Sequence, residues 1–295
     1  MHISVCICTF KRPDLLKRLL DEMDRQMTEG LFSYSVVVAD NDRMQSARHV
    51  VTEFAAASSL PITYCVEPEQ NIALARNRAL ENVKGDFVAF IDDDEIPGQD
   101  WLCSLLKTGK KYEVAGVLGP VKPYFEHKPP QWVSNGKFFE RPTYHTGYQL
   151  DWRETRTGNV LFRRDILDGV KSVFRPEFGT GSEDTDFFKR MMEKGNQFVW
   201  CNEAVVHEVI PSSRCTRSYL LRRALLRGRN SLRQRADRVR NLSKSLIAVP
   251  VYGLALPFYW IAGEHHFLKL LIRFCDHAGR LLGVLGFNPV KERDL

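Results

Sequence analysis

The sequence predicts an α/β protein with a mostly parallel central sheet, flanking helices and a helical C-terminal extension. Short apolar runs at residues 3–8, 34–39, 62–66 and 87–91 alternate with helical patterns. They begin 31, 28 and 25 residues apart, which suits parallel strands joined by helical crossovers. After residue 213 this alternation gives way to basic and apolar helical patterns.

The composition is that of an ordinary globular protein. Its 295 residues, 44% hydrophobic and 26% charged, allow one large domain or two small ones. The seven cysteines are scattered and form no C-x-x-C pair, which argues against a disulfide framework or a structural zinc site and fits a reducing cytosol. Because the first residues enter a strand pattern at once, we expect no signal peptide.

Two helices are expected within the first hundred residues. Residues 15–23 place five apolar side chains on one face, and Pro13 suits the first turn of that helix. The second helix is expected over residues 72–83, ending before Gly85.

The chain changes character between residues 119 and 156, where prolines alternate with aromatic residues. This pattern is typical of a long ordered loop. Its aromatic faces suit sugar rings, but packing of the same side chains on the core is an equally good interpretation. A strand at 160–162, a short helix at 164–170 and a helix from Ser182 to just before Gly195 follow.

Polar side chains gather where the predicted strands end. Residues 9–13, 40–42 and 92–94 follow the first, second and fourth strands. Ligands of open parallel sheets bind beyond the carboxyl ends of the strands, so we expect these clusters on one edge. Asp40 and Asp42, taken alone, also fit an ordinary polar turn.

Asp92-Asp93-Asp94 is the most informative of these clusters. Carboxylates this close repel one another unless a cation lies between them, although a solvated acidic turn is the alternative interpretation. No G-x-G-x-x-G or G-x-x-x-x-G-K-[ST] sequence follows the first strand, so a glycine-rich loop does not hold any diphosphate here. Metal binding by the triplet is the remaining route. If strand geometry persists, Asp93 points away from its two neighbours and matters less.

Seven short motifs, in this order and spacing, resemble those of the family 2 glycosyltransferases. They are Cys8-Thr9-Phe10-Lys11-Arg12-Pro13, Val38-Ala39-Asp40-Asn41-Asp42, Asn71-Ile72-Ala73-Leu74-Ala75-Arg76-Asn77, Phe90-Ile91-Asp92-Asp93-Asp94, Thr157-Gly158-Asn159-Val160-Leu161-Phe162-Arg163-Arg164, Gly181-Ser182-Glu183-Asp184 and His207. Within the family, the chain looks most like bacterial exopolysaccharide and cell-envelope enzymes. The resemblance implies a GT-A fold with a Rossmann-like sheet in a catalytic domain over residues 1–213. Its nucleotide-binding half would be 1–118 and its acceptor-binding half 119–213, with an extension over 214–295.

The resemblance also implies roles for single residues. It assigns nucleotide-sugar binding to Thr9, Arg12, Asp40, Asp42, Asn71, Arg76, Asp92, Asp93, Asn159 and Glu183. Metal binding would fall to Asp92, Asp94 and His207, with Asp94 favoured as a direct ligand, and Asp184 would be the catalytic base. Thr9 and Asp40 would contact the nucleoside, Asp40 by accepting from a base N–H. Because Asp40-Asn41-Asp42 departs from the family's usual Asp-Asp-Gly-Ser type, the base stays open between UDP, which we favour, and GDP or dTDP.

The resemblance implies a metal-dependent, inverting transfer of a hexose from a nucleotide-sugar to a saccharide hydroxyl, and the residue types suit this chemistry. A divalent cation, Mn²⁺ or Mg²⁺, would stabilise the charge that develops on the leaving diphosphate. Asp184, at a helix N-terminus, would take the proton of the acceptor hydroxyl in a single displacement. Two alternatives remain: a sugar nucleotidyltransferase, and a non-catalytic homologue that binds nucleotide and membrane.

The C-terminal third concentrates the positive charge of the chain. Residues 214–244 hold ten Arg and one Lys against Asp237, a net of +10, so the rest of the chain sums to −4. Residues 245–263 contain no charge, are borderline in length for a membrane span and are interrupted by Pro250 and Pro257. A basic amphipathic helix follows.

We expect this extension to attach the enzyme to an anionic surface at the cytoplasmic face of the cell membrane, where a lipid-linked acceptor would lie. The attachment could be peripheral or monotopic, and a single span is also possible. Packing of the extension on the catalytic domain is the alternative. A nucleic-acid partner is not expected, because the apolar run would have no purpose there.

Overall fold

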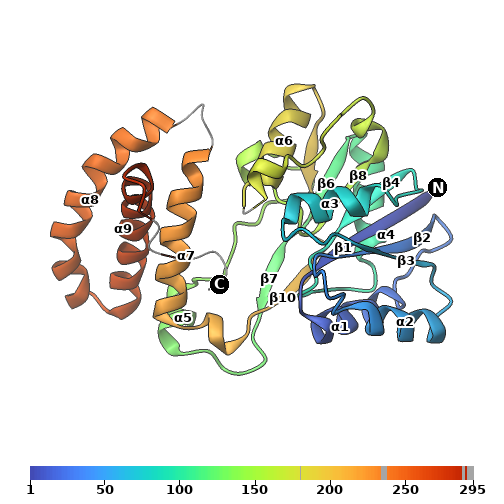
Figure 1. The fold of residues 1–295 in the computed structure, drawn as a ribbon, viewed down its shortest axis with the longest axis horizontal. Helices are drawn as coiled ribbons and strands as arrows, with labels where there is room; N and C mark the ends of the chain where they lie inside the picture. The colour runs from blue at the N-terminus through green and yellow to red at the C-terminus, as the bar shows by residue number, and fades with distance from the viewer. Residues whose placement is uncertain (180, 234–237, 288–289, 291–295) are drawn as a thin grey trace. The chain divides into compact units, whose positions relative to one another are not determined.

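The structure, a computed structural model, describes all residues except 180, 234–237, 288–289 and 291–295. The chain forms two compact units (Figure 1). The first, here called the sheet unit, comprises Met1–Pro123 and Arg141–Val209, and the second, the helical unit, comprises Tyr124–Glu140 and Ile210–Leu295. This division differs from the expected domains, because a segment of the proline- and aromatic-rich region joins the helical unit.

A seven-stranded sheet forms the centre of the sheet unit, in the order β3-β2-β1-β4-β8-β6-β9. Its strands are β1 (His2–Thr9), β2 (Ser33–Asp40), β3 (Ile62–Val66), β4 (Phe87–Phe90), β6 (Gly116–Leu118), β8 (Val160–Arg163) and β9 (Phe198–Trp200). The first four strands pair in parallel, as does β6 with β9, and β8 runs antiparallel to both of its neighbours. The four strands predicted from the apolar runs are confirmed. A smaller sheet of β5 (Glu95–Pro97), β10 (Val206–Val209) and β7 (Val121–Tyr124) adjoins the end of β4.

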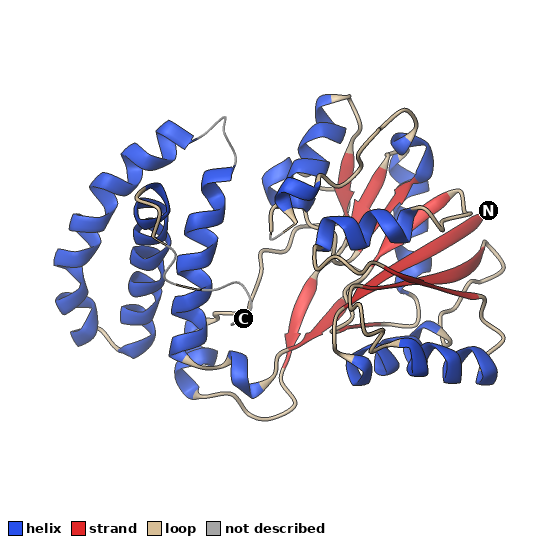
Figure 2. Ribbon diagram, viewed as in Figure 1, coloured by secondary structure: helices blue, strands red, loops and turns tan. Residues whose placement is uncertain are grey.

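Helices cover both faces of the large sheet, as Figure 2 shows. The first face packs on α1 (Pro13–Met23), α2 (Arg48–Ala57) and α4 (Trp101–Tyr112), and the other on α3 (Ile72–Leu80) and α6 (Glu183–Glu193). Strand alternation explains these two cores. In β2, for example, Val36 and Val38 face the first core whereas Val37 and Ala39 face the second.

The less regular segments depart from the sequence-based expectations in two places. The short helix expected at 164–170 is a single 3-10 turn, Arg164–Leu167; similar turns occur at Trp152–Glu154 and Pro176–Phe178. The expected loop at 119–156 contains β7 and α5 (Gln131–Gly136).

The aromatic residues of that region are mostly core residues, so the packing interpretation was the better one. Phe125, Trp132, Phe138 and Phe139 pack in the small core of the helical unit, and the Phe125 and Phe139 rings lie 5.9 Å apart. Tyr148 and its neighbours pack on the second core of the sheet unit.

The helical unit is built from α7 (Arg217–Asn230), α8 (Arg238–Ile261) and α9 (Glu264–Val284), with 3-10 turns at Ser212–Arg214 and Ser231–Arg233. Helix α9 contacts both of the others. The Arg227 guanidinium pairs with Asp276 of α9, and the Trp260 ring of α8 lies 5.0 Å from that of Phe267. We expected Pro250 and Pro257 to interrupt the apolar segment, but α8 continues through both. Both prolines are exposed.

Candidate active site

The polar clusters at the strand ends do share one edge of the sheet. Thr9, the last residue of β1, lies opposite Asp40, the last residue of β2. The end of β4 is held beside β1 by a hydrogen bond from the Ile91 amide to the Cys6 carbonyl, so residues 92–94 emerge at the same edge. The sheet topology therefore gathers these acids, as predicted.

The Asp triplet is a turn, not a continuation of the strand. The Arg12 guanidinium lies 3.2 Å from a carboxylate oxygen of both Asp93 and Asp94, and the Thr9 hydroxyl donates to Asp93 at 2.8 Å. Our expectation that Asp93 points away from its neighbours is wrong, because the turn breaks the alternation of side chains. Burial raises the pKa of Asp93, while Arg12 and the Thr9 hydrogen bond act in the opposite direction.

A second arginine compensates the remaining carboxylate of the triplet. Arg76 is buried on α3, with its Nη2 3.7 Å from Asp92 Oδ1 and its Nη1 in an ion pair with Glu183 at the start of α6. Burial lowers the pKa of Arg76, but Glu183 and Asp92 outweigh burial and the net shift is upward, so Arg76 stays cationic. Guanidinium groups thus supply part of the charge compensation that the sequence led us to ascribe to a metal.

Glu183 and Asp184 begin α6 but lie in different surroundings. Glu183 is buried, and burial raises its pKa to about 7, although Arg76 acts in the opposite direction. Its Oε1 pairs with Arg76, whereas Oε2 makes no hydrogen bond within the described residues. Asp184 is partly exposed and accepts from the Thr185 amide at 2.7 Å. Of these two acids, Asp184 is thus the more exposed, and Glu183 is the one held in the ion pair with Arg76.

Two further residues belong to this site although no binding or catalytic role was predicted for them. Glu95 is buried directly after the triplet, and its Oε2 accepts from the Asp92 amide at 3.1 Å. Burial, followed by Asp92, raises the pKa of Glu95 well above its usual value. Thr157 is also buried, and its hydroxyl makes no hydrogen bond within the described residues. A fourth consecutive acid was the available signal for Glu95, and Thr157 opens the quoted motif at residues 157–164, although only Asn159 of that motif was given a role.

Gly158 lets the segment before β8 approach these acids. A Cβ added at this position would lie 2.8 Å from Glu95 Oε1 and 3.0 Å from Asp92 Oδ2. Any larger residue would push against both carboxylates. The glycine therefore keeps the Thr157 backbone close to the triplet.

Asp40 is turned into the protein. Its side chain is fully buried and accepts from the Ala47 amide at 2.9 Å, the Tyr64 hydroxyl at 2.8 Å and the Asp42 amide at 3.0 Å. Asp42 is also buried and accepts from the Met44 amide. A carboxylate has about four lone-pair positions, so Asp40 uses most of them to shape its own loop.

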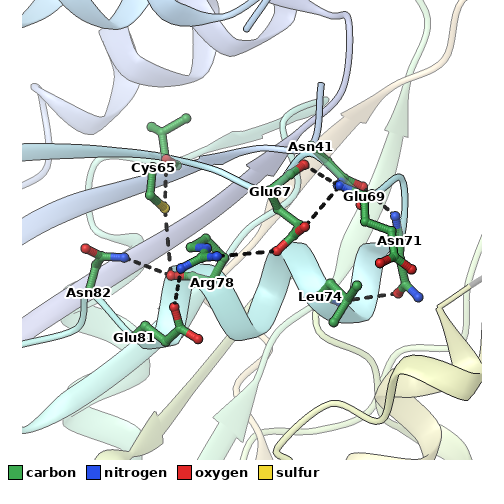
Figure 3. Close-up of polar contacts among 10 residues, drawn as sticks. Asn41, Cys65, Glu67, Glu69, Asn71, Leu74, Arg78, Glu81 and Asn82 are labelled. Carbon is green, nitrogen blue, oxygen red and sulfur yellow. Dashed lines mark hydrogen bonds and ion pairs between the residues drawn. The ribbon is translucent and has the colours of Figure 1, made fainter. Parts of the chain in front are cut away.

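Asn71 likewise uses its side chain within the fold. Its side-chain Oδ1 accepts from the Ala73 and Leu74 backbone amides and thereby caps α3. The backbone amide of Asn71 donates to Asn41 Oδ1 (Figure 3). Asn41 in turn donates to the Glu67 and Glu69 carbonyls, which fixes the segment after β3 (Figure 3). These hydrogen bonds shape the loops that follow β2 and β3, and they engage the Asn71 and Asn41 side chains within the protein.

Asn159 is not brought to the site surface. Its side chain is fully buried, accepts from Trp101 Nε1 at 2.7 Å and donates to the Pro120 and Ala204 carbonyls. Its φ of 56° lies in the left-handed region that asparagine tolerates better than most residues. Asn159 thus joins β8, α4 and the approach to β10 and holds Gly158 in place.

The residues expected to bind a metal are only partly assembled. Asp92 has 48% of its side chain exposed, while Asp94 is almost buried beside Arg12. His207 is exposed on β10 opposite Ile96, in the strand whose Val209 amide donates to the Asp94 carbonyl. Outside the masked positions, no three His, Cys, Asp or Glu side chains form a group that could hold a metal ion. Carboxylate oxygens are ligands of the kind that Mn²⁺ and Mg²⁺ prefer, and Asp92 is the most exposed carboxylate of the triplet.

Comparison with solved structures defines the class of fold. The mannosyltransferase PcManGT from Pyrobaculum calidifontis, in complex with GDP-Man and Mn²⁺, matches with a TM-score of 0.61 at 20% identity over 96% of this chain and 86% of that one. S. aureus TarS 1-349 in complex with UDP-GlcNAc matches with a TM-score of 0.56 at 14% identity, covering 98% and 93%. The sheet unit is a GT-A fold, as the resemblance implied.

Sequence comparison then identifies the family. Residues 4–170 match the model of glycosyl transferase family 2. The succinoglycan biosynthesis protein ExoM of Rhizobium meliloti (strain 1021) is 33% identical over 303 residues, covering 99% of this chain and 96% of the relative. The chain belongs to glycosyltransferase family 2. It is therefore a glycosyltransferase, and the alternative prediction of a sugar nucleotidyltransferase is wrong.

Proposed function

We propose that this enzyme transfers a hexose, with inversion, from a nucleotide-sugar to a hydroxyl of a saccharide acceptor in exopolysaccharide synthesis. The observation that carries the proposal is the linkage of two accessible carboxylates through one buried ion pair. Asp92 and Asp184 are both partly exposed, and Arg76 contacts Asp92 while pairing with Glu183, the neighbour of Asp184. This linkage fixes the position of Asp92, which would serve the leaving diphosphate, relative to Asp184, which would serve the attacking hydroxyl.

Each end of this arrangement has a distinct task. Asp184 accepts the proton of the acceptor hydroxyl as that oxygen attacks the anomeric carbon. The Glu183 and Thr157 side-chain oxygens that make no hydrogen bond within the described residues would bind sugar hydroxyls, which would satisfy two buried polar groups. Thr9 and Arg12 orient the triplet that faces the diphosphate.

Metal dependence is part of the proposal. Asp92, together with Asp94, would hold Mn²⁺ or Mg²⁺, and His207 is the third candidate ligand. When bound, the cation neutralises charge on the departing diphosphate as a Lewis acid. Arg12 and Arg76 supply positive charge at the same edge and lower the repulsion among the acids. The Mn²⁺ in the PcManGT complex supports this assignment.

A nucleoside diphosphate sugar is the donor that the neighbours support. TarS is described with UDP and with UDP-GlcNAc, and PcManGT with GDP-Man. We favour a UDP-sugar. The name of the Rhizobium relative supports a saccharide acceptor of exopolysaccharide synthesis, and a lipid-linked acceptor would account for the apolar C-terminal helix.

The helical unit would hold the enzyme at the cytoplasmic face of the membrane. It contains a helix long and apolar enough to meet a bilayer, and the basic segment that precedes this helix suits anionic lipids. Exopolysaccharide synthesis in the relative is compatible with this location.

Thermal-shift titration with UDP-, GDP- and dTDP-sugars, with and without Mn²⁺, tests the donor and the metal together. Binding stabilises by mass action, by about 2.7 kcal/mol at a hundred times Kd, so one donor series should raise Tm only when Mn²⁺ is present. Asp92→Asn should remove the Mn²⁺-dependent part, whereas the exposed Asp14→Asn should retain it. A donor shift that is identical with EDTA contradicts the metal assignment. No turnover across donors with matched acceptors would favour the non-catalytic homologue.

A further inference from the structure

Helix α8 presents one continuous exposed stripe. At the spacing that keeps side chains on one face of a helix, seven exposed residues follow one another: Arg240, Lys244, Ile247, Val251, Leu254, Phe258 and Ile261. Leu254 is 76% exposed and Ile261 is 85% exposed. A face of large apolar side chains this long is unusual on a protein surface that meets only water.

By length and composition, this helix could also cross a bilayer. The candidate segment Val239–Ile261 has 23 residues, and an 18-residue window within it has a mean hydropathy of 1.3. Length and hydropathy do not separate a helix that spans a membrane from one that lies on it. The contacts of α8 with α9 and the charges on α7 and α9 distinguish the two orientations.

Helix α9 runs antiparallel along most of α8. Ser245 contacts His277, the ring of Tyr252 lies 5.6 Å from that of His277, and the Trp260 ring packs on Phe267. These contacts extend from the first turns of α8 to its last turn. If α8 crossed a bilayer with these contacts intact, α9 would have to enter it as well.

The charges of the other two helices oppose such an entry. Lys269 and Arg273 are exposed on α9. Helix α7, which pairs with α9 through Arg227 and Asp276, exposes Arg222 and Arg223. Cations are among the most costly residues to place at the centre of a bilayer. The three-helix arrangement is therefore incompatible with a span by α8.

The inner face of α8 is also unsuited to lipid. Ser245 is fully buried there, and its hydroxyl contacts His277 Nδ1 at 2.9 Å and accepts from Arg280 at 3.4 Å. Arg280 also donates to Ser231 at 2.8 Å. Separating α8 from α9 in a bilayer would leave these polar groups without partners.

We propose that α8 lies in the plane of the membrane surface, with its exposed stripe in the lipid and α9 between it and α7. The inference rests on the membrane attachment included in the proposed function. Arg240 and Lys244 begin the stripe and complement anionic head groups, and Trp260 is exposed near its other end, a residue type that favours the interface. The occupant of the stripe is thus a lipid surface, not a second copy of the chain.

Flotation of the full-length protein with lipid vesicles tests the attachment. The protein should float with vesicles of equal parts phosphatidylcholine and phosphatidylglycerol, and less with phosphatidylcholine alone. Leu254→Glu should lower the floated fraction about tenfold, because it places a charge in the middle of the apolar stripe. Met27→Glu, at an exposed apolar residue of the sheet unit, should float like the wild type. Both positions are exposed, so circular dichroism should show both variants folded.

Extraction and fusion experiments test the orientation. In cells, the membrane-bound protein should be released by alkaline carbonate, and a C-terminal green fluorescent protein should fluoresce while a C-terminal alkaline phosphatase stays inactive. Carbonate resistance, with or without active phosphatase, would show that α8 spans or enters the bilayer and would overturn the in-plane orientation alone. A wild-type protein that floats with neither vesicle overturns the attachment itself. Concentration-dependent dimerisation that Leu254→Glu abolishes, without flotation, would assign the stripe to a second copy.

Discussion

The two units of this glycosyltransferase place apolar and polar groups in opposite ways. In the sheet unit, strand residues such as Val5 and Val38 have no exposed surface, and exposed apolar residues such as Met44 are isolated. In the helical unit, the most exposed apolar side chains line α8, while a polar cluster around Ser245 and His277 is enclosed between helices. The first unit thus encloses most of its apolar side chains, whereas the second exposes a continuous row of them.

This difference shows which interactions each unit depends on. The sheet unit can enclose Glu183 at this edge because the Arg76 guanidinium compensates its charge. The helical unit has a small apolar core, and glycines allow the backbones of α7 and α9 to approach each other closely. A Cβ added to Gly228 of α7 would collide with the Asp276 backbone of α9. Substitutions in the two units should therefore fail in different ways.

Arg76→Met should have the largest effect on stability, because it leaves Glu183 buried without its cation. Removing one partner of a buried pair costs about 3–5 kcal/mol, so we expect a loss of that order in urea unfolding of the sheet unit. Arg78→Met, two residues along α3, is the matched control. Its side chain is 41% exposed and its ion pairs should contribute less than about 1 kcal/mol. Equal losses in the two variants would show that the buried pair contributes no special stability.

Asn159→Ala should come next, since it removes three buried hydrogen bonds from one side chain. Groups left buried and unsatisfied cost about 1–3 kcal/mol, and alanine also tolerates the positive φ less well. Urea unfolding should show a loss of about 3 kcal/mol. Asn202→Ala, at an exposed asparagine, should change the unfolding free energy by less than about 0.5 kcal/mol. If Asn159→Ala changes the unfolding free energy only slightly, the structural role of Asn159 is contradicted and the predicted role in nucleotide-sugar binding is favoured.

Gly228→Ala and Gly253→Ala form a matched pair within the helical unit. Gly228→Ala forces α7 away from the α9 backbone and should cost about 1–3 kcal/mol through overpacking. A Cβ at Gly253 has an ordinary contact of 3.8 Å with Phe274, so Gly253→Ala should stabilise α8 by up to about 1 kcal/mol. Thermal unfolding of both variants measures these changes. If both stabilise the unit, α7 and α9 do not approach each other as closely as described.

Much of the fold could be predicted from the sequence, because periodicity reports local burial. The first four strands, α1 and α3 lie where apolar spacing placed them. Helices α2 and α4 were not predicted, although α4 carries the fully buried Trp101. The aromatic residues of 119–156 were ambiguous for a physical reason: an aromatic ring suits a core as well as a sugar, and only tertiary contacts decide.

The sequence predicted which residues gather at the candidate site better than it predicted the contacts that they make. Motifs located the acids, and the shared strand edge brought Thr9 close to the triplet. Sequence spacing could not show that a turn directs Asp93 toward Arg12, or that Asp40 is engaged by its own loop. Such contacts depend on which donors surround a carboxylate in three dimensions. Glu183, the buried partner of Arg76, is 107 residues away from it in the sequence.

The most direct measurement of the proposed mechanism separates donor binding from transfer in Asp184→Asn. This substitution keeps the shape of the side chain but removes the proton acceptor, so kcat should fall by about 10²–10⁴-fold while donor Kd stays within about twofold of wild type. Glu193→Gln, at the exposed end of the same helix, should change neither quantity. Transfer by Asp184→Asn at the wild-type rate would exclude Asp184 as the base, and a parallel loss of donor affinity would make it a binding residue.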